Sequence, residues 1–190
     1  MSKGRLEAFS DGVLAILITI MVLELGVPHE PTLAALLPLV PVFLSYILSF
    51  IFLGIYWNNH HHLLQATKQV NGSVLWANLH LLFWLSLVPF TTAWMGETEF
   101  EALPVAVYGL VLLLAAIAYY ILARALVTLH GAESPLAIAL GKDVKGKISP
   151  ILYLLAIPLA FVSPWISCGL YVLVAAMWLV PDRRIEKTIS

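Results

Sequence analysis

Long apolar runs that recur from one end of the chain to the other are the feature that most limits what it can fold into. Of its 190 residues, 61% are hydrophobic and only 11% are charged, against roughly 25% in a typical soluble domain. One helical crossing of a bilayer core takes about 20 apolar residues. The chain therefore has room for several crossings and little else. We predict an all-α integral membrane protein with a single domain over residues 1–190.

Turn residues and charges between the apolar runs divide the chain into six predicted transmembrane helices. Their ranges are 6–25, 33–64, 70–94, 102–126, 148–162 and 164–180. The last two are short and are separated only by the letters VSPW, so a tight helical hairpin and five spans are the alternative. Pro158 is expected to kink the fifth helix.

The basic residues all fall on one side of this six-span arrangement. They are Lys3, Arg5, Lys68, Arg124, Lys142, Lys145, Lys147, Arg183, Arg184 and Lys187. Since Lys and Arg accumulate in cytoplasmic loops, both termini are predicted to be cytoplasmic. The basic residues form no stripe and the net charge is only −1, so nucleic acid is not an expected partner.

The first predicted helix combines an apolar stripe with polar residues at the membrane edge. At 100° per residue, one stripe contains Gly12, Ile16, Thr19, Ile20 and Leu23. Packing against lipid or a neighbouring helix explains such a stripe as readily as a pore does. Arg5, Ser10 and Asp11 are predicted to lie off the stripe and to act as scaffold, because polar groups at this depth need partners.

Candidate partners for this scaffold lie in the second and third predicted helices. They are Trp57, His61, Asn78 and His80. The run from His60 to His62 also suggests a metal site or a proton relay, because histidine titrates near neutral pH and binds zinc. Three successive helical residues point in three directions, however. We therefore expect no metal site and a structural role for one or two of these histidines.

The segment RLEAFSDGVLAILITIMVLEL resembles the first helix of the bacterial branch of the lysosomal/endosomal transmembrane potassium channel family. The mark of that helix is an arginine, three residues and then Phe-Ser-Asp, here Arg5, Phe9, Ser10 and Asp11. The resemblance continues in order through FLGIYWNNHHHLL, ANLHLLFWLSLVPFTTAWMG and WLVPDRRIE. The chain is identified on these motifs as a member of the family.

This resemblance implies a homotetramer in the bacterial inner (plasma) membrane, in which four copies of the first helix line a central pore. It implies a passive, moderately potassium-selective cation channel that is not an enzyme and uses no cofactor besides the permeant potassium ions. Carried over by position, Ile16 would form a hydrophobic gate, Ile20 and Leu23 would extend it, and Thr19 would contribute to selectivity.

A proton- or cation-coupled transporter is the main alternative, with Asp11, Glu24 and the histidines as titrating groups. Transporters often contain inverted repeats, and no repeat is visible in this sequence. A membrane enzyme with a metal at Asp11 and the His60 to His62 run is a third class, and the differing directions of the histidines argue against it.

Overall fold

The computed structural model describes residues 2–131, 133–140 and 144–179, and every regular element within these ranges is a helix. The α-helices are α1 (Lys3–Ile20), α2 (Val40–Gln65), α3 (Gly72–Ser86), α4 (Val88–Glu97), α5 (Ala102–His130), α6 (Pro135–Leu140), α7 (Val144–Leu159) and α8 (Pro164–Leu179). Two 3-10 segments, η1 (Met21–Glu24) and η2 (Leu33–Leu39), continue α1 and precede α2. The predicted all-α class is confirmed.

Within the described ranges, four helical segments are long and apolar enough to cross a membrane. They are Lys3–Glu24, Leu33–Gln65, Gly72–Glu97 and Ala102–His130, which correspond to the first four predicted spans. The fifth and sixth predicted spans correspond to α7 and α8, which have only 16 residues each and follow one another as a hairpin. The count of six crossings therefore stays a prediction.

The third predicted span is not one regular helix. It divides at Leu87 into α3 and α4, because Pro89 at the start of α4 has no N–H with which to continue the ladder of α3. The start of α3 is fixed by Asn71, whose side chain accepts a hydrogen bond from the N–H of Val74 at 3.0 Å.

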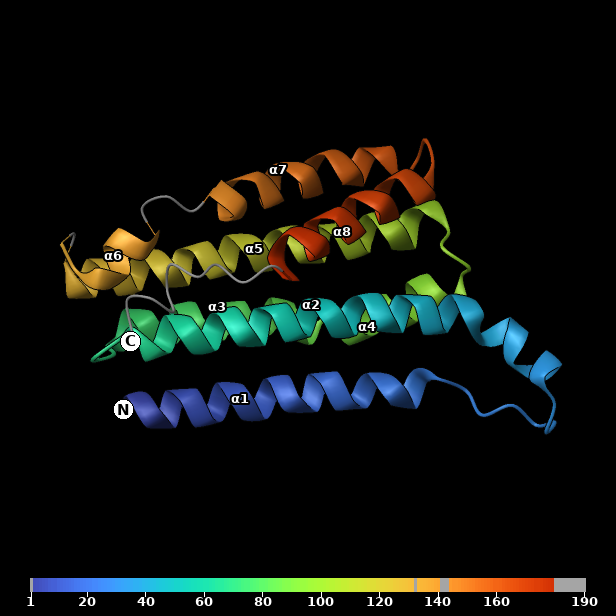
Figure 1. The fold of residues 1–190 in the computed structure, drawn as a ribbon, viewed down its shortest axis with the longest axis horizontal. Coiled ribbons are helices and arrows are strands. Elements are labelled where there is room, and N and C mark those ends of the chain that lie inside the picture. Colours follow the sequence, from blue (N-terminus) through green and yellow to red (C-terminus); the bar gives the residue numbers. More distant parts are fainter. Residues whose placement is uncertain (1, 132, 141–143, 180–190) are drawn as a thin grey trace.

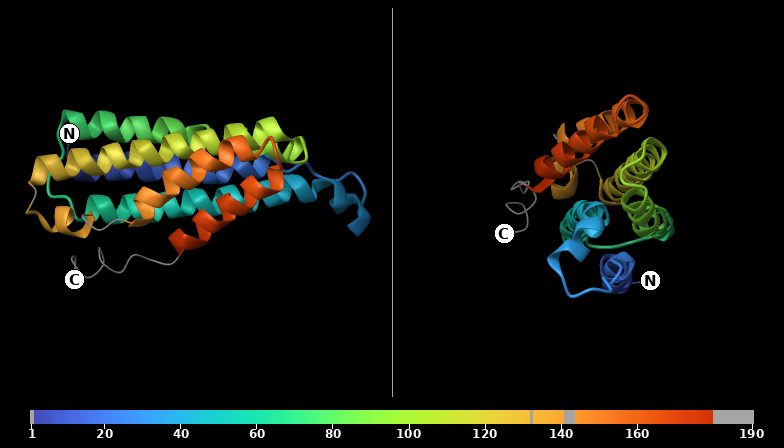
Figure 2. Two further views of the ribbon diagram at one scale, coloured as in Figure 1. Left: turned by 90° about the horizontal axis from the view of Figure 1, so that it is seen from above. Right: turned by 90° about the vertical axis from the view of Figure 1, so that its right-hand side faces the viewer.

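The helices lie along one long axis, with α1 at one edge and the α7–α8 hairpin at the other (Figure 1). Helix α5 packs against both α3 and α7, while α2 packs against α4. The end-on view in Figure 2 shows α1 beside α2 at the margin of the bundle. The peripheral position of α1 leaves one of its faces without a neighbour in the subunit.

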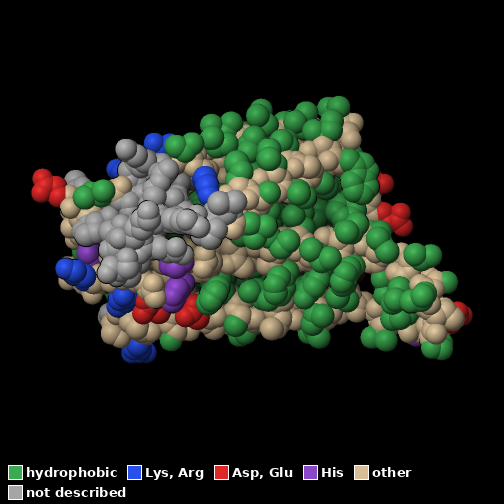
Figure 3. Space-filling view, in the orientation of Figure 1, with side chains coloured by type: hydrophobic (Ala, Val, Ile, Leu, Met, Phe, Trp, Pro, Cys, Tyr) green, Lys and Arg blue, Asp and Glu red, His purple; other side chains and the backbone are tan. Residues whose placement is uncertain are grey.

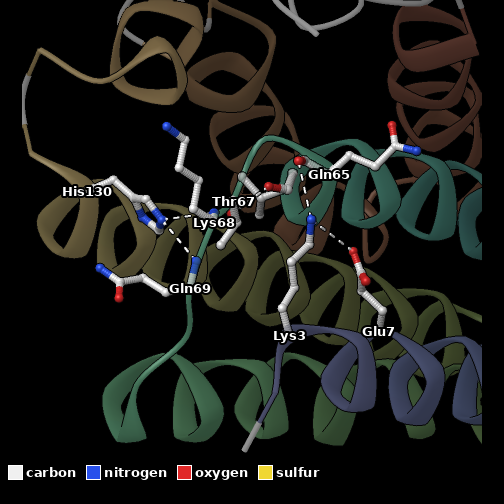
Figure 4. A network of polar contacts seen from close by, with 8 residues as sticks. Lys3, Glu7, Gln65, Thr67, Lys68, Gln69 and His130 are labelled. Carbon is white, nitrogen blue, oxygen red and sulfur yellow. Dashed lines mark hydrogen bonds and ion pairs between the residues drawn. The ribbon is translucent and has the colours of Figure 1, made fainter.

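The two ends of the bundle differ in charge. On the face in Figure 3, the Lys and Arg side chains lie toward the end where α1 begins, together with some acidic side chains, whereas Asp and Glu but no Lys or Arg are visible at the opposite end. At the basic end, Lys3 Nζ donates to the Gln65 carbonyl at 3.3 Å and lies 3.6 Å from the Glu7 carboxylate (Figure 4). His130 Nε2 accepts the backbone N–H of Lys68 at 3.1 Å, which ties the α2–α3 turn to α5.

Candidate functional site

Helix α1 has one buried and one exposed face. The buried face packs on the bundle through Leu6, Ser10, Leu14 and Leu17. The exposed face contains Ile16 and Ile20 of the apolar stripe, which are 59% and 39% exposed. The stripe continues into η1 at Leu23, which is 78% exposed. The isolated subunit leaves this row of apolar side chains open to lipid or to another protein chain.

Thr19 lies on this exposed face, one turn from Ile16. Its hydroxyl donates back to its own helix, with the Ala15 carbonyl at 2.9 Å and the Ile16 carbonyl at 3.0 Å. Because the single hydroxyl proton points to the backbone, the oxygen lone pairs are directed away from it. An exposed hydroxyl in this state is an acceptor and can therefore bind a cation.

Arg5 and Phe9 lie on the same exposed face as the stripe, and Phe9 is 48% exposed. In the single subunit Arg5 is exposed rather than buried against a neighbouring helix, and its predicted scaffold role stays a prediction. Arg5 precedes Ile16 by about three full helical turns, which returns it to the same side of the helix. Among the described residues, no hydrogen bond or ion pair holds its guanidinium.

A directional chain of hydrogen bonds joins α1, α2 and α3 behind the stripe. His60 Nε2 lies 2.7 Å from Asn78 Oδ1, and Asn78 Nδ2 donates to Ser10 Oγ at 2.9 Å. Ser10 in turn donates to the Leu6 carbonyl at 2.9 Å. Since the amide oxygen can only accept, His60 Nε2 carries the proton. The three side chains are at most 1% exposed, so each needs its partner.

Asp11 makes a separate contact between α1 and α2. The Trp57 indole N–H donates to Asp11 Oδ1 at 3.1 Å, and the Trp57 ring stacks on His61 with centroids 5.9 Å apart. This pair is partly exposed, in contrast to the buried chain of Ser10 and Asn78. The two contacts fix the rotation of α1 about its axis and hence the direction of the exposed stripe.

The structure separates the predicted partners into three groups. Trp57 and Asn78 donate hydrogen bonds to side chains of α1, and His61 stacks on the Trp57 ring. His80 is exposed and accepts the indole N–H of Trp84 at 2.9 Å within α3 itself. No metal-binding group of three or more His, Cys, Asp or Glu side chains occurs among the described residues.

Among the three successive histidines, sequence reasoning named His61 as the partner of the first helix, whereas in the structure His60 joins the buried chain. Helix α2 is apolar nearly all round, so no stripe in its sequence singles out one histidine. In the structure His60 follows the buried Leu53 by two turns and precedes the buried Leu63 and Leu64 by one. This spacing places His60, rather than His61, on the face that packs into the bundle. The three histidines do point in different directions, as the helical geometry requires.

Comparison with known proteins gives relatives over the full chain. The family model "Endosomal/lysosomal potassium channel TMEM175" matches residues 5–89. A potassium channel of Chryseobacterium sp. (strain P1-3) is 58% identical over 190 residues, which is 100% of this chain and 99% of the relative. A potassium channel of Chamaesiphon minutus (strain ATCC 27169 / PCC 6605) is 32% identical over 183 residues, or 87% of this chain and 88% of the relative.

One solved structure is also similar along most of its length. It is the crystal structure of a lysosomal potassium-selective channel TMEM175 homolog from Chamaesiphon minutus. Its TM-score to this chain is 0.81 at 32% sequence identity, with 94% of this chain and 96% of that chain covered. At this identity and coverage the likeness extends to the arrangement of the helices.

Proposed function

The chain belongs to the endosomal/lysosomal potassium channel (TMEM175) family, and from this membership we propose that it is a subunit of a potassium channel that conducts K⁺ passively. The observation that carries the proposal is the exposed face of α1, an apolar row with one hydroxyl on a helix whose other face is buried. A second copy of the chain, rather than lipid alone, is the proposed neighbour of this face.

In this proposal four copies of α1 surround a central pore in a homotetramer. Ile16 forms the narrow hydrophobic gate, and Ile20 and Leu23 extend the apolar wall. A tight ring of branched aliphatic side chains offers no ligand to an ion that loses water, so it closes the pore by dewetting. The exposed fractions of these three side chains in the single subunit support the assignment.

Thr19 is the proposed contributor to moderate K⁺ selectivity. Its hydroxyl proton is used by the backbone, which leaves the oxygen as the group that faces a passing cation. Potassium gives up hydration water more readily than sodium, so a partly dehydrating ring of such oxygens favours it. Arg5, which lies on the same face, is then proposed to line the basic mouth of the pore.

The proposed location is the bacterial inner membrane, with the basic end of the bundle and both termini in the cytoplasm. The positive-inside rule and the charge difference between the two ends in Figure 3 support this orientation. The C-terminal residues after 179 lie outside the described ranges, so their side rests on the sequence alone. A coupled transporter is the alternative function, in which flux would not follow the K⁺ gradient alone.

The decisive experiment replaces Ile16 by Asn and records currents from purified protein in liposomes. A polar ring would wet the gate, so we expect resting K⁺ current per folded channel to rise by about tenfold or more and discrimination against Na⁺ to fall. The mass of the purified protein in mild detergent is measured alongside. The proposal is contradicted if the purified protein is a monomer, or if the reversal potential of the wild type does not follow the K⁺ gradient.

The matched control is Ile117→Asn on α5. Ile117 is 39% exposed and is an isoleucine in a transmembrane helix, but it is far from the α1 stripe. Leu17, the neighbour of Ile16, is unsuitable because it is only 6% exposed and packs in the core. If the Ile16 and Ile117 variants assembled equally well and gave equal currents, Ile16 would not form the gate.

A further inference from the structure

A cavity of about 240 Å³ lies between α2, α5, α6, α7 and α8. It exists because the helices around it differ in length. Helices α7 and α8 have 16 residues each, about 24 Å, whereas α5 has 29 residues, about 44 Å. In Figure 1 the hairpin lies along the half of α5 nearer the acidic end, and α6 lies beside α5 at the basic end.

The wall of this cavity is mainly apolar and aromatic, with Phe52, Ile55, Ala116, Tyr153 and Trp178 among its residues. Two of the polar side chains in the wall have partners within the subunit. Tyr119 donates to the Asn59 carbonyl at 3.2 Å, and the Trp178 indole donates to Ser149 Oγ at 2.9 Å. A molecule in the cavity would therefore contact mainly carbon atoms, so the wall suits a hydrocarbon chain.

Two cationic side chains, Arg124 from α5 and Lys147 from α7, complete the lining of the same cavity. Both residues are exposed, and neither forms an ion pair with another described residue. An apolar chamber bordered by two unpaired cations, at the basic end of a membrane protein, matches a molecule with an anionic head and an apolar tail. Basic pockets between transmembrane helices bind anionic lipid head groups in this way.

We propose that this cavity is a binding site for an anionic phospholipid from the leaflet at the basic end. One acyl chain occupies the chamber that Phe52 and Tyr153 help to line, and the phosphate lies between Arg124 and Lys147. The site is remote from the exposed face of α1, which lies on the other edge of the bundle (Figure 2). The inference is therefore independent of which ion the protein conducts.

The test is native mass spectrometry of the full-length protein, purified in mild detergent and incubated with phosphatidylglycerol or with zwitterionic phosphatidylcholine. We expect retained phosphatidylglycerol in the wild type and weaker retention of phosphatidylcholine. The double variant Arg124→Gln, Lys147→Gln should lower phosphatidylglycerol affinity by about tenfold, since each cation near an anionic head contributes to binding. Ala116→Phe, which fills the chamber, should also lower it.

Lys68→Gln is the matched control, because Lys68 is an exposed cation at the same end but is not in the cavity wall. The proposal would be overturned if the Arg124→Gln, Lys147→Gln double variant bound phosphatidylglycerol as tightly as the Lys68→Gln variant does. A photoreactive amino acid at Tyr120 identifies the occupant directly. Crosslinks to phospholipid support the site, whereas crosslinks to residues 180–190 of the chain or to fatty acid alone overturn it.

Discussion

At the scale of single residues, Asn78 holds the most consequential position, because it connects α1 to α2 from its place on α3. Its amide accepts from His60 and donates to Ser10, and none of these side chains has access to water. Replacement of Asn78 by Leu keeps the approximate volume but leaves the His60 N–H without an acceptor. We expect a loss of about 2 kcal/mol in stability and a lower temperature of unfolding in detergent.

The control for this change is Asn58→Leu, because Asn58 lies exposed on α2 and undergoes the same chemical substitution. It should unfold within about 0.5 kcal/mol of the wild type, as exposed substitutions usually do. An Asn78→Leu protein as stable as this control would mean that the buried chain of hydrogen bonds does not position α1.

At the scale of elements, the contact between α2 and α4 depends on a glycine. A Cβ added to Gly96 would lie 2.7 Å from the Cα of Val42 and 2.6 Å from Ser45 Oγ, so the two backbones must separate to admit it. Small residues permit such close approach between transmembrane helices. We expect Gly96→Ala to cost about 1–3 kcal/mol, measured as a lower unfolding temperature of the purified protein.

Gly169→Ala on α8 is its counterpart, because nothing lies within 4 Å of a Cβ added there. In a helix the extra methyl lowers the entropy of the unfolded chain, so this variant should be neutral or stabilised by about 0.5–1 kcal/mol. If the two glycine variants unfolded at one temperature, the close approach of α2 and α4 would have no energetic importance.

At the scale of the whole molecule, the two ends of the bundle should face different compartments. The orientation is tested with single cysteines in a protein in which Cys168 is replaced by Ala. One cysteine replaces Gln69, near the basic end, and the other replaces Glu97, at the end of α4. We expect a membrane-impermeant maleimide to label the Glu97 position in intact cells and the Gln69 position only after permeabilisation. The reverse pattern would invert the proposed orientation.

The sequence by itself determined the properties that depend on local periodicity and on composition. The scarcity of charge requires a membrane solvent, and apolar runs in such a solvent form helices because every backbone polar group must be paired. The spacing of Ile16, Thr19, Ile20 and Leu23 places them on one face of any regular helix. The family follows from ordered motifs and is confirmed by a relative that is 58% identical over the full chain.

Only the tertiary structure decided which side chains meet. The helical period alone places Arg5 on the same side of α1 as Ile16. That Arg5 has no partner among the described residues follows only from the way α2 and α3 pack around α1. His60 replaces His61 in the buried chain because the rotation of α2 depends on its packing against α4 and α8. The cavity beside Arg124 likewise results from the short α7–α8 hairpin packing on longer helices. Contacts between distant segments depend on how whole helices pack, and the period of any single helix does not contain that information.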